Sequence, residues 1–106
     1  MSSFNDREKA FESKFAHDQE LKFKATARRN KLLGEWAAEQ MSLSGDEAQA
    51  YVSEVIRSDL EEPGDEDVFR KVWTDFQAKN VDLSEHQLRR QIVDLMEEAI
   101  RQIEGK

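Results

Sequence analysis

The sequence predicts an all-α protein, a four-helix bundle with a flexible or extended N-terminal helical arm. Apolar residues recur at helical spacing along almost the whole chain. Serine caps and a Pro-Gly break divide that pattern into segments. No useful stretch alternates polar and apolar residues as a half-buried strand would. The chain has 106 residues, the size of one ordinary domain.

The N-terminal segment carries an aromatic stripe that differs from the apolar stripe following it. Phe4, Phe11 and Phe15 fall within an arc of roughly 40° if the segment is helical. The next positions on that line are the charged residues Asp18 and Lys22. A second stripe, rotated by about 70°, is formed by Leu21, Ala25, Leu32 and Trp36. Because one core surface would not normally use both stripes, we divide the chain into an arm, residues 1–19, and a bundle, residues 20–106.

The first bundle helix is expected over roughly 21–41, and the second, over 45–60, follows a capping box. In "SGDE", the Ser44 hydroxyl can accept from the backbone N–H of Glu47, whose carboxylate can reach back. The apolar face of the second helix consists of Ala48, Tyr51, Val52, Val55, Ile56 and Leu60.

The third and fourth helices, expected over roughly 65–79 and 85–104, also follow recognisable start signals. "EPGDED" ends the second helix and places three acids, Asp65–Asp67, in the first turn of the third, where they offset the helix dipole. "SEHQ", Ser84–Gln87, is a second cap of the S-x-x-Q type. The apolar faces that follow these starts are Val68, Phe69, Val72, Trp73 and Phe76, then Leu88, Ile92, Leu95, Met96, Ala99, Ile100 and Ile103.

Charge and composition limit the classes of function. The net charge is −7, yet residues 1–31 hold eight bases and five acids, a net of +3, which leaves −10 for the remainder. A basic N-terminal part on an acidic body indicates an interaction protein. The chain has no cysteine and no apolar run near the roughly 20 residues that span a bilayer. The N-terminus also lacks the apolar region of a signal peptide, so we expect a cytoplasmic protein.

No pattern of catalytic or cofactor-binding residues stands out, and we expect no enzyme. His17 and His86 lie far apart, and the serines lie in caps and loops. His17 and Glu20 share a helix face, but two ligands are too few for structural zinc, and no metal is expected. Asp65–Asp67 lacks the spacing of a calcium loop. Neither phosphate-binding glycine motif is present.

The densest basic patch is "KFKATARRNK", Lys22–Lys31. It is compatible with binding phosphates, but the acidic net charge opposes polyanions, so no nucleic acid is expected as a partner. The alternative is a solvated helix face whose bases pair with acids of neighbouring helices.

The phenylalanine stripe permits three interpretations. The arm can fold back as a fifth piece of core, fill a groove in a partner protein through spaced aromatic anchors, or lie on a membrane surface. The mixture of acids and bases on its polar face disfavours the membrane. The arm as a piece of core and the arm as a partner-binding segment therefore both stay open, and a small cytoplasmic adaptor or assembly factor that binds a partner protein is one class of function that fits.

Three segments resemble one known family: "FAHDQELKFKATARRNKLLGEWAAEQM", "GDEAQAYVSEVI" and "GDEDVFRKV". They are similar to the zeta subunit of the F-type ATP synthase of alphaproteobacteria, an inhibitor family formerly described as a domain of unknown function. The resemblance covers nearly the whole chain in the same order. It is weakest after Lys79, where the sequence is generic amphipathic helix.

The resemblance implies a regulatory subunit whose N-terminal segment enters the catalytic interface between the alpha and beta subunits and blocks ATP hydrolysis. It implies a cytoplasmic protein, peripheral to the inner membrane through the ATP synthase, with no direct membrane insertion. We expect a monomer when free and no cofactor; weak adenine-nucleotide binding, linked to some members, has no supporting motif here. Carried to this sequence, the partner-binding residues are Phe4, Arg7, Glu8, Phe11, Lys14 and Phe15.

Overall fold

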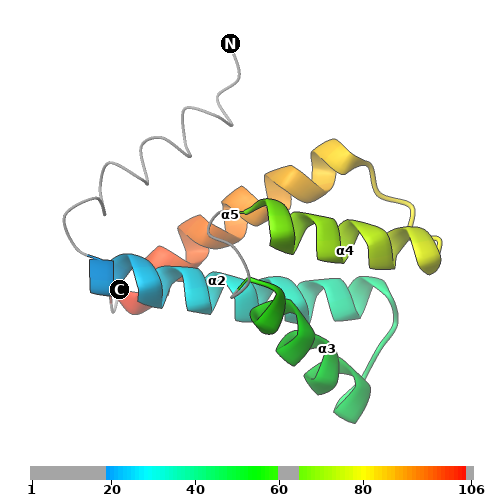
Figure 1. The fold of residues 1–106 in the computed structure, drawn as a ribbon, viewed down its shortest axis with the longest axis horizontal. Helices are drawn as coiled ribbons and strands as arrows, with labels where there is room; N and C mark the ends of the chain where they lie inside the picture. Colours follow the sequence, from blue (N-terminus) through cyan, green and yellow to red (C-terminus); the bar gives the residue numbers. More distant parts are fainter. Residues whose placement is uncertain (1–18, 60–64, 105–106) are drawn as a thin grey trace.

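The computed structural model describes residues 19–59 and 65–104, which form four α-helices and, within those ranges, no strand. The helices are α2 (Gln19–Gln40), α3 (Gly45–Ser58), α4 (Glu66–Ala78) and α5 (Glu85–Ile103) (Figure 1). Each boundary lies within two residues of its predicted position. The predicted all-α class is confirmed, and the four helices form the expected bundle.

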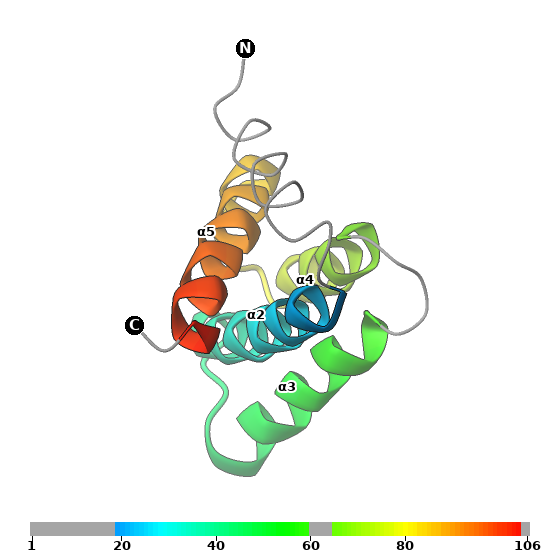
Figure 2. The same cartoon turned by 90° about the vertical axis from the view of Figure 1, so that its left-hand side faces the viewer.

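Helix α2 is the centre of the arrangement. It packs against α3 and α5, while α4 packs against α3 and α5. In both views α2 and α5 lie side by side and run in opposite directions, so the start of α2 meets the end of α5 (Figures 1 and 2).

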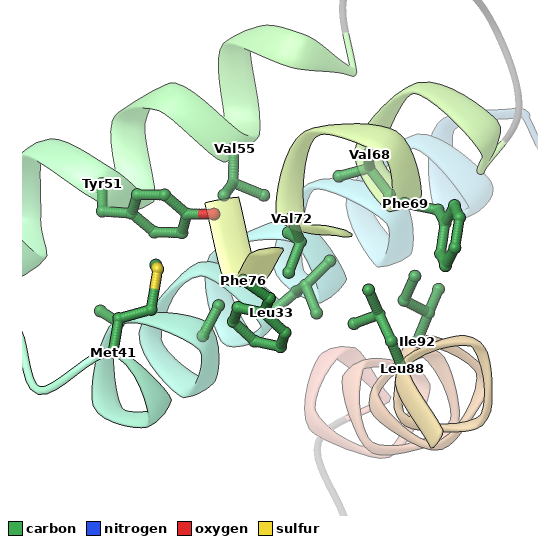
Figure 3. Close-up of a cluster of buried hydrophobic side chains, with 12 residues drawn as sticks. Leu33, Met41, Tyr51, Val55, Val68, Phe69, Val72, Phe76, Leu88 and Ile92 are labelled. Carbon is green, nitrogen blue, oxygen red and sulfur yellow. The ribbon is translucent and has the colours of Figure 1, made fainter. Parts of the chain in front are cut away.

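The main core lies where all four helices meet (Figure 3). Its buried side chains come from every helix, and the Trp36 and Phe76 rings extend it with centroids 5.7 Å apart. A smaller cluster lies at the start of α2, where Ala25 packs on Ile100. The buried members of the main core are Leu33, Ala37, Ala38, Met41, Tyr51, Val55, Val68, Phe69, Val72, Phe76, Leu88 and Ile92.

A glycine lets α2 and α3 approach closely. A Cβ added to Gly34 would lie 2.8 Å from the Val52 Cα, a distance at which the backbone of α3 must move. Any side chain at this position would therefore separate the two helices. Gly34 is buried within α2 and makes the crossing possible despite its low helix propensity.

The two predicted capping boxes have different outcomes. At α5 the box is confirmed: Gln87 N donates to Ser84 Oγ over 3.1 Å, and Ser84 N donates to Gln87 Oε1 over 2.8 Å. At α3 the prediction is wrong, because the Ser44 side chain makes no cap hydrogen bond. The backbone gives the reason: Gly45 has φ +57°, a left-handed conformation that turns the chain between the serine and the first helical turn.

The predicted apolar stripes of α2 and α3 need correction. Of Leu21, Ala25, Leu32 and Trp36 only Ala25 is fully buried, although Leu21 and Trp36 pack at the edges of the two clusters. The buried arc of α2 continues from Ala25 through Arg29, Leu33, Ala37 and Ala38. Helix α2 packs against both α3 and α5, so a broad arc of its surface is buried, and several of the residues on that arc are alanines. On α3, Ile56 is 37% exposed although its spacing placed it on the core face, and Leu60 lies outside the described residues.

Candidate functional site

The residues predicted to bind a partner all lie in the arm, outside the residues that the structure describes. These are Phe4, Arg7, Glu8, Phe11, Lys14 and Phe15. His17, the histidine of the discounted metal pair, lies there too. What the structure describes is the root of the arm, the first turns of α2 from Gln19 onward, and the body that holds this root.

The root is held by the last turns of α5. Ala25 and Ile100 are 1% and 4% exposed and pack together, with partly buried hydrophobic side chains around them. Arg28 Nη1 also donates to Gln102 Oε1 over 3.3 Å. Figure 2 shows the start of α2 beside the end of α5. The surrounding side chains are Leu21, Met96 and Ile103.

The basic segment Lys22–Lys31 divides into an exposed part and a buried part. Four of its cations are exposed, and so is Phe23, at 70%. Arg29 is fully buried, so the interpretation of the whole segment as a solvated face is wrong at this position. Arg29 follows Ala25 by four residues and precedes Leu33 by four, which places it on the buried line of α2. The exposed cations are Lys22, Lys24, Arg28 and Lys31.

Buried Arg29 organises a polar cluster that ties the α3–α4 connection to α2. Its Nε donates to Asn30 Oδ1 over 2.8 Å, and its Nη1 donates to Asp65 Oδ1 over 3.0 Å. Asn30 in turn hydrogen-bonds Asp59 at the end of α3. Thus both residues that flank the segment 60–64, Asp59 and Asp65, are held by α2. Asp65 occupies the N-cap position of α4 but binds Arg29 instead of capping the helix.

The groups of this cluster act on the pKa of Asp59 in opposite directions. Burial raises the pKa of Asp59 above its ordinary value, and the like charges of Asp65 and Asp67 act in the same direction. The hydrogen bond from Asn30 and the charge of Arg29 oppose this effect. One guanidinium nitrogen, Arg29 Nη2, is buried without a hydrogen-bond partner. A buried cation with one ion pair and one amide acceptor fixes geometry, at a desolvation cost.

A second polar cluster joins α3 and α4. Lys71 Nζ lies 2.6 Å from Glu54 Oε1, 2.9 Å from Asp75 Oδ2 and 5.2 Å from the centroid of the Tyr51 ring. Burial and the adjacent Asp75 raise the pKa of the Tyr51 hydroxyl. A cavity of about 150 Å³ borders this cluster, and Met41, Leu43, Ala78 and Lys79 complete its lining. The contacts of Lys71 clasp two helices together.

The two clusters join different pairs of elements of the body. Within 19–59 and 65–104, no group of three or more His, Asp or Glu side chains could hold a metal ion. In the second cluster, Glu54 and Asp75 both form ion pairs with Lys71. The helices that the structure describes also include none long and apolar enough to cross a membrane. Both clusters hold the helices of the body together.

Comparisons with known proteins identify the family. The family model described as "ATPase inhibitor subunit zeta" matches residues 1–102, which include both the arm and the four helices. A protein whose structure was solved by solution NMR is 48% identical, with a TM-score of 0.70, and the alignment covers 79% of this chain and 95% of that chain. No curated protein matches the chain. The match over almost the full sequence places this chain in the ATPase inhibitor subunit zeta family.

Proposed function

We propose that this chain inhibits ATP hydrolysis by the F-type ATP synthase, by inserting residues 1–19 at the catalytic interface between the alpha and beta subunits. The observation that carries the proposal is the family match, because it extends from residue 1 through the bundle and so includes the arm. An inhibitor family also favours a regulatory role over a catalytic one. In this proposal the chain lies in the cytoplasm, peripheral to the inner membrane through the ATP synthase.

The described helices support a division of labour between the arm and the body. Helices α2 to α5 bury a core made of their own side chains, from Leu33 on α2 to Ile92 on α5. At 100° per residue the phenylalanine stripe has the same phase as Arg29 and Leu33, which α2 buries, so the division rests on the family match over the arm and not on a difference of phase. Aromatic side chains spaced along one face of a helix are suited to a groove in another protein.

The proposed mechanism is a wedge. A catalytic interface that opens and closes during rotation cannot do so with a helix lodged in it. Phe4, Phe11 and Phe15 would act as apolar anchors, each contributing about 1.5–3 kcal/mol if fully buried. The conformational entropy lost when the arm becomes ordered offsets part of this energy. Arg7, Glu8 and Lys14 would supply polar contacts along the wedge, and their partners would be groups of the alpha and beta subunits.

The body raises the effective concentration of the wedge at its target. Because the root of the arm is packed on α5 through Ala25 and Ile100, the arm starts from a fixed position on the bundle. If the bundle also contacts the target, insertion becomes an intramolecular step with a raised effective concentration. This links the small packing cluster at the start of α2 to the inhibitory task.

The test is a titration of ATP hydrolysis by the purified catalytic sector from the same organism. The full chain is compared with the double variant Phe11→Ala/Phe15→Ala and with Ile56→Ala, which removes an exposed apolar side chain from α3. We expect inhibition by the full chain and by Ile56→Ala, and strongly weakened inhibition by the double variant. The full chain and the double variant should unfold at nearly the same temperature, measured by circular dichroism, and Ile56→Ala, which removes a side chain that is only 37% exposed, should unfold at a slightly lower temperature.

Two results would contradict the proposal. A large loss of thermal stability in the double variant would show that Phe11 and Phe15 belong to the core. Inhibition by the double variant at the same concentration as the full chain would show that the stripe does not anchor the wedge. Binding of the full chain to the catalytic sector without any inhibition would instead favour the adaptor.

A further inference from the structure

One side of the first turns of α2 presents an exposed strip. Each member has another three or four residues away, so they share one face of the helix. All of them are exposed, and Phe23 at 70% is the most exposed large hydrophobic side chain of the described residues. This α2 strip consists of Glu20, Phe23, Lys24, Ala27 and Lys31.

The strip is uncovered because the body meets α2 elsewhere. The last turns of α5 pack on Ala25, on the other side of the helix. Helix α3 crosses α2 further along, where Val52 meets Gly34, and the end of α3 reaches only as far as Asn30 through Asp59. No described helix therefore covers Phe23. An aromatic ring left in water on a helix with few other apolar side chains on that face does not contribute to the fold.

The position of the strip along the chain relates it to the arm. Phe23 comes four residues after Gln19, which corresponds to about 6 Å along the helix axis. If residues 1–19 are lodged in an interface of the target, a side chain that close to the end of the wedge lies at the mouth of the interface. The surface around the mouth must then lie against one face of the first turns of α2.

We infer that the α2 strip is a second docking surface for the catalytic sector, seated on an apolar hollow bordered by carboxylates at the mouth of the interface. This inference rests on the proposed function, since the arm determines which surface the strip meets. Phe23 fills the hollow, and Ala27 leaves room for the close approach of the partner. Lys24 and Lys31 face the carboxylates.

Charge favours an acidic partner surface. Residues 1–31 carry +3, whereas residues 32–106 carry −10, so the exposed cations of α2 lie on the one part of the chain with a basic balance. Glu20 belongs to the strip, four residues before Lys24, a spacing that allows these two to pair on the helix surface. Lys31 lies further along and has Ala27 as its neighbour on the strip.

The strip has a different effect from the arm. Contacts at the mouth hold the inhibitor in place but do not prevent the interface from closing. Removing them therefore raises the concentration needed for half-maximal inhibition and leaves the maximal inhibition unchanged. Phe23→Ala is expected to raise that concentration about tenfold, from the loss of one buried aromatic side chain. The charge reversal Lys24→Glu/Lys31→Glu should do the same at low salt, with a smaller effect at high salt.

The experiment measures two quantities for each full-length variant: the dissociation constant for the immobilised catalytic sector, by biolayer interferometry, and the titration of ATP hydrolysis. Ile56→Ala is the control for Phe23→Ala, because both remove an exposed apolar side chain. Arg90→Glu is the control for the charge reversal. Arg90 is exposed on α5 and lies ten residues before Ile100, about 15 Å from the root along the axis.

Weaker binding by Phe23→Ala, with unchanged maximal inhibition and an unchanged melting temperature, supports the inference. Binding as tight as that of Ile56→Ala overturns it, as does a melting temperature lowered by several degrees, which would assign Phe23 to the fold. If the full chain binds without inhibiting, the wedge fails, yet weaker binding by Phe23→Ala still supports the strip. If the full chain does not bind the catalytic sector, both the wedge and the strip are overturned.

Discussion

The first turns of α2, from Gln19 to Arg28, are held chiefly by α5, whereas the rest of the helix lies in a core shared with α3, α4 and α5. In the first part Phe23 is 70% exposed; in the second, even Arg29 is fully buried. Because burial determines local stability, one continuous helix combines a lightly anchored root with a firmly packed body. In the proposed function, the root connects the arm to the body, and movement of the root need not disturb the core.

Among the variants that test this comparison, the largest loss of stability is expected in the packed part of α2. Leu33 is fully buried in the main core, and Leu33→Ala should lower the free energy of unfolding by about 3 kcal/mol, from lost apolar contacts and a residual cavity. Urea denaturation measures it. The matched change in the root, Phe23→Ala, should leave the free energy within about 0.5 kcal/mol of the parent. Equal losses in the two variants would contradict the division of α2.

A smaller effect is expected at the anchor of the root. Ile100 is 4% exposed, but several of its neighbours are only partly buried, so Ile100→Ala should cost about 2 kcal/mol, at the low end for a buried aliphatic residue. Amide hydrogen exchange should accelerate most at residues 21–25 of α2 and least at residues 33–40. Uniform acceleration along the helix would show that root and body unfold as one unit.

The smallest effect is expected at the boundary between the two parts, where Asp59 contacts Asn30. Because the pKa of Asp59 is raised in the folded state, the ionised carboxylate destabilises the fold at neutral pH, and this penalty is relieved as the pH falls through the raised pKa. Asp59→Asn should therefore raise the melting temperature at pH 7. The difference from the parent should shrink toward acidic pH, as the parent carboxyl becomes neutral.

The control for that prediction is Asp67→Asn, which removes a neighbouring like charge but leaves the hydrogen bond of Asp59 to Asn30 in place. It should also relieve Asp59, although it breaks the 2.8 Å pair between Arg70 and Asp67. A melting temperature of Asp59→Asn that is lower than that of the parent at pH 7 would mean that the attraction of Arg29 outweighs burial.

The helices could be predicted from the sequence because periodicity, caps and the Pro-Gly break all indicate the same boundaries. The cap at Ser84 could be predicted because Gln87 follows at the required spacing and the backbone between them is helical. The cap at Ser44 has the equivalent spacing, with Glu47 in place of glutamine, but the left-handed conformation of Gly45 removes the hydrogen bond. A residue pattern does not report such a local backbone choice.

Burial within α2 was harder to predict, because it depends on how many neighbours the helix has. Leu32 and Trp36 are expected in the core because they are large and apolar. They are only partly buried, whereas the small residue Ala37 is fully buried. The position of Arg29 between Ala25 and Leu33 was the available signal of a buried cation. The exposure of Phe23 depends on where α3 ends over α2, which periodicity alone does not determine.

The candidate site was predicted on two separate grounds. The change of phase between the phenylalanine stripe and the second stripe indicated a segment with its own task, but the line that α2 buries through Arg29 and Leu33 returns to the phase of the phenylalanines. The partner and the residues Phe4, Arg7, Glu8, Phe11, Lys14 and Phe15 came from the resemblance, and the family is now confirmed by the match over residues 1–102. The roles of those six residues stay predictions.

The most direct test of the central claim compares the full chain with a chain that lacks residues 1–19, in an assay of ATP hydrolysis by the catalytic sector at saturating inhibitor. The account predicts that the full chain inhibits, that the shortened chain does not, and that the shortened chain still unfolds cooperatively near the parent melting temperature. Inhibition by the shortened chain would locate the activity in the bundle, and failure of the shortened chain to fold would make the arm part of the core.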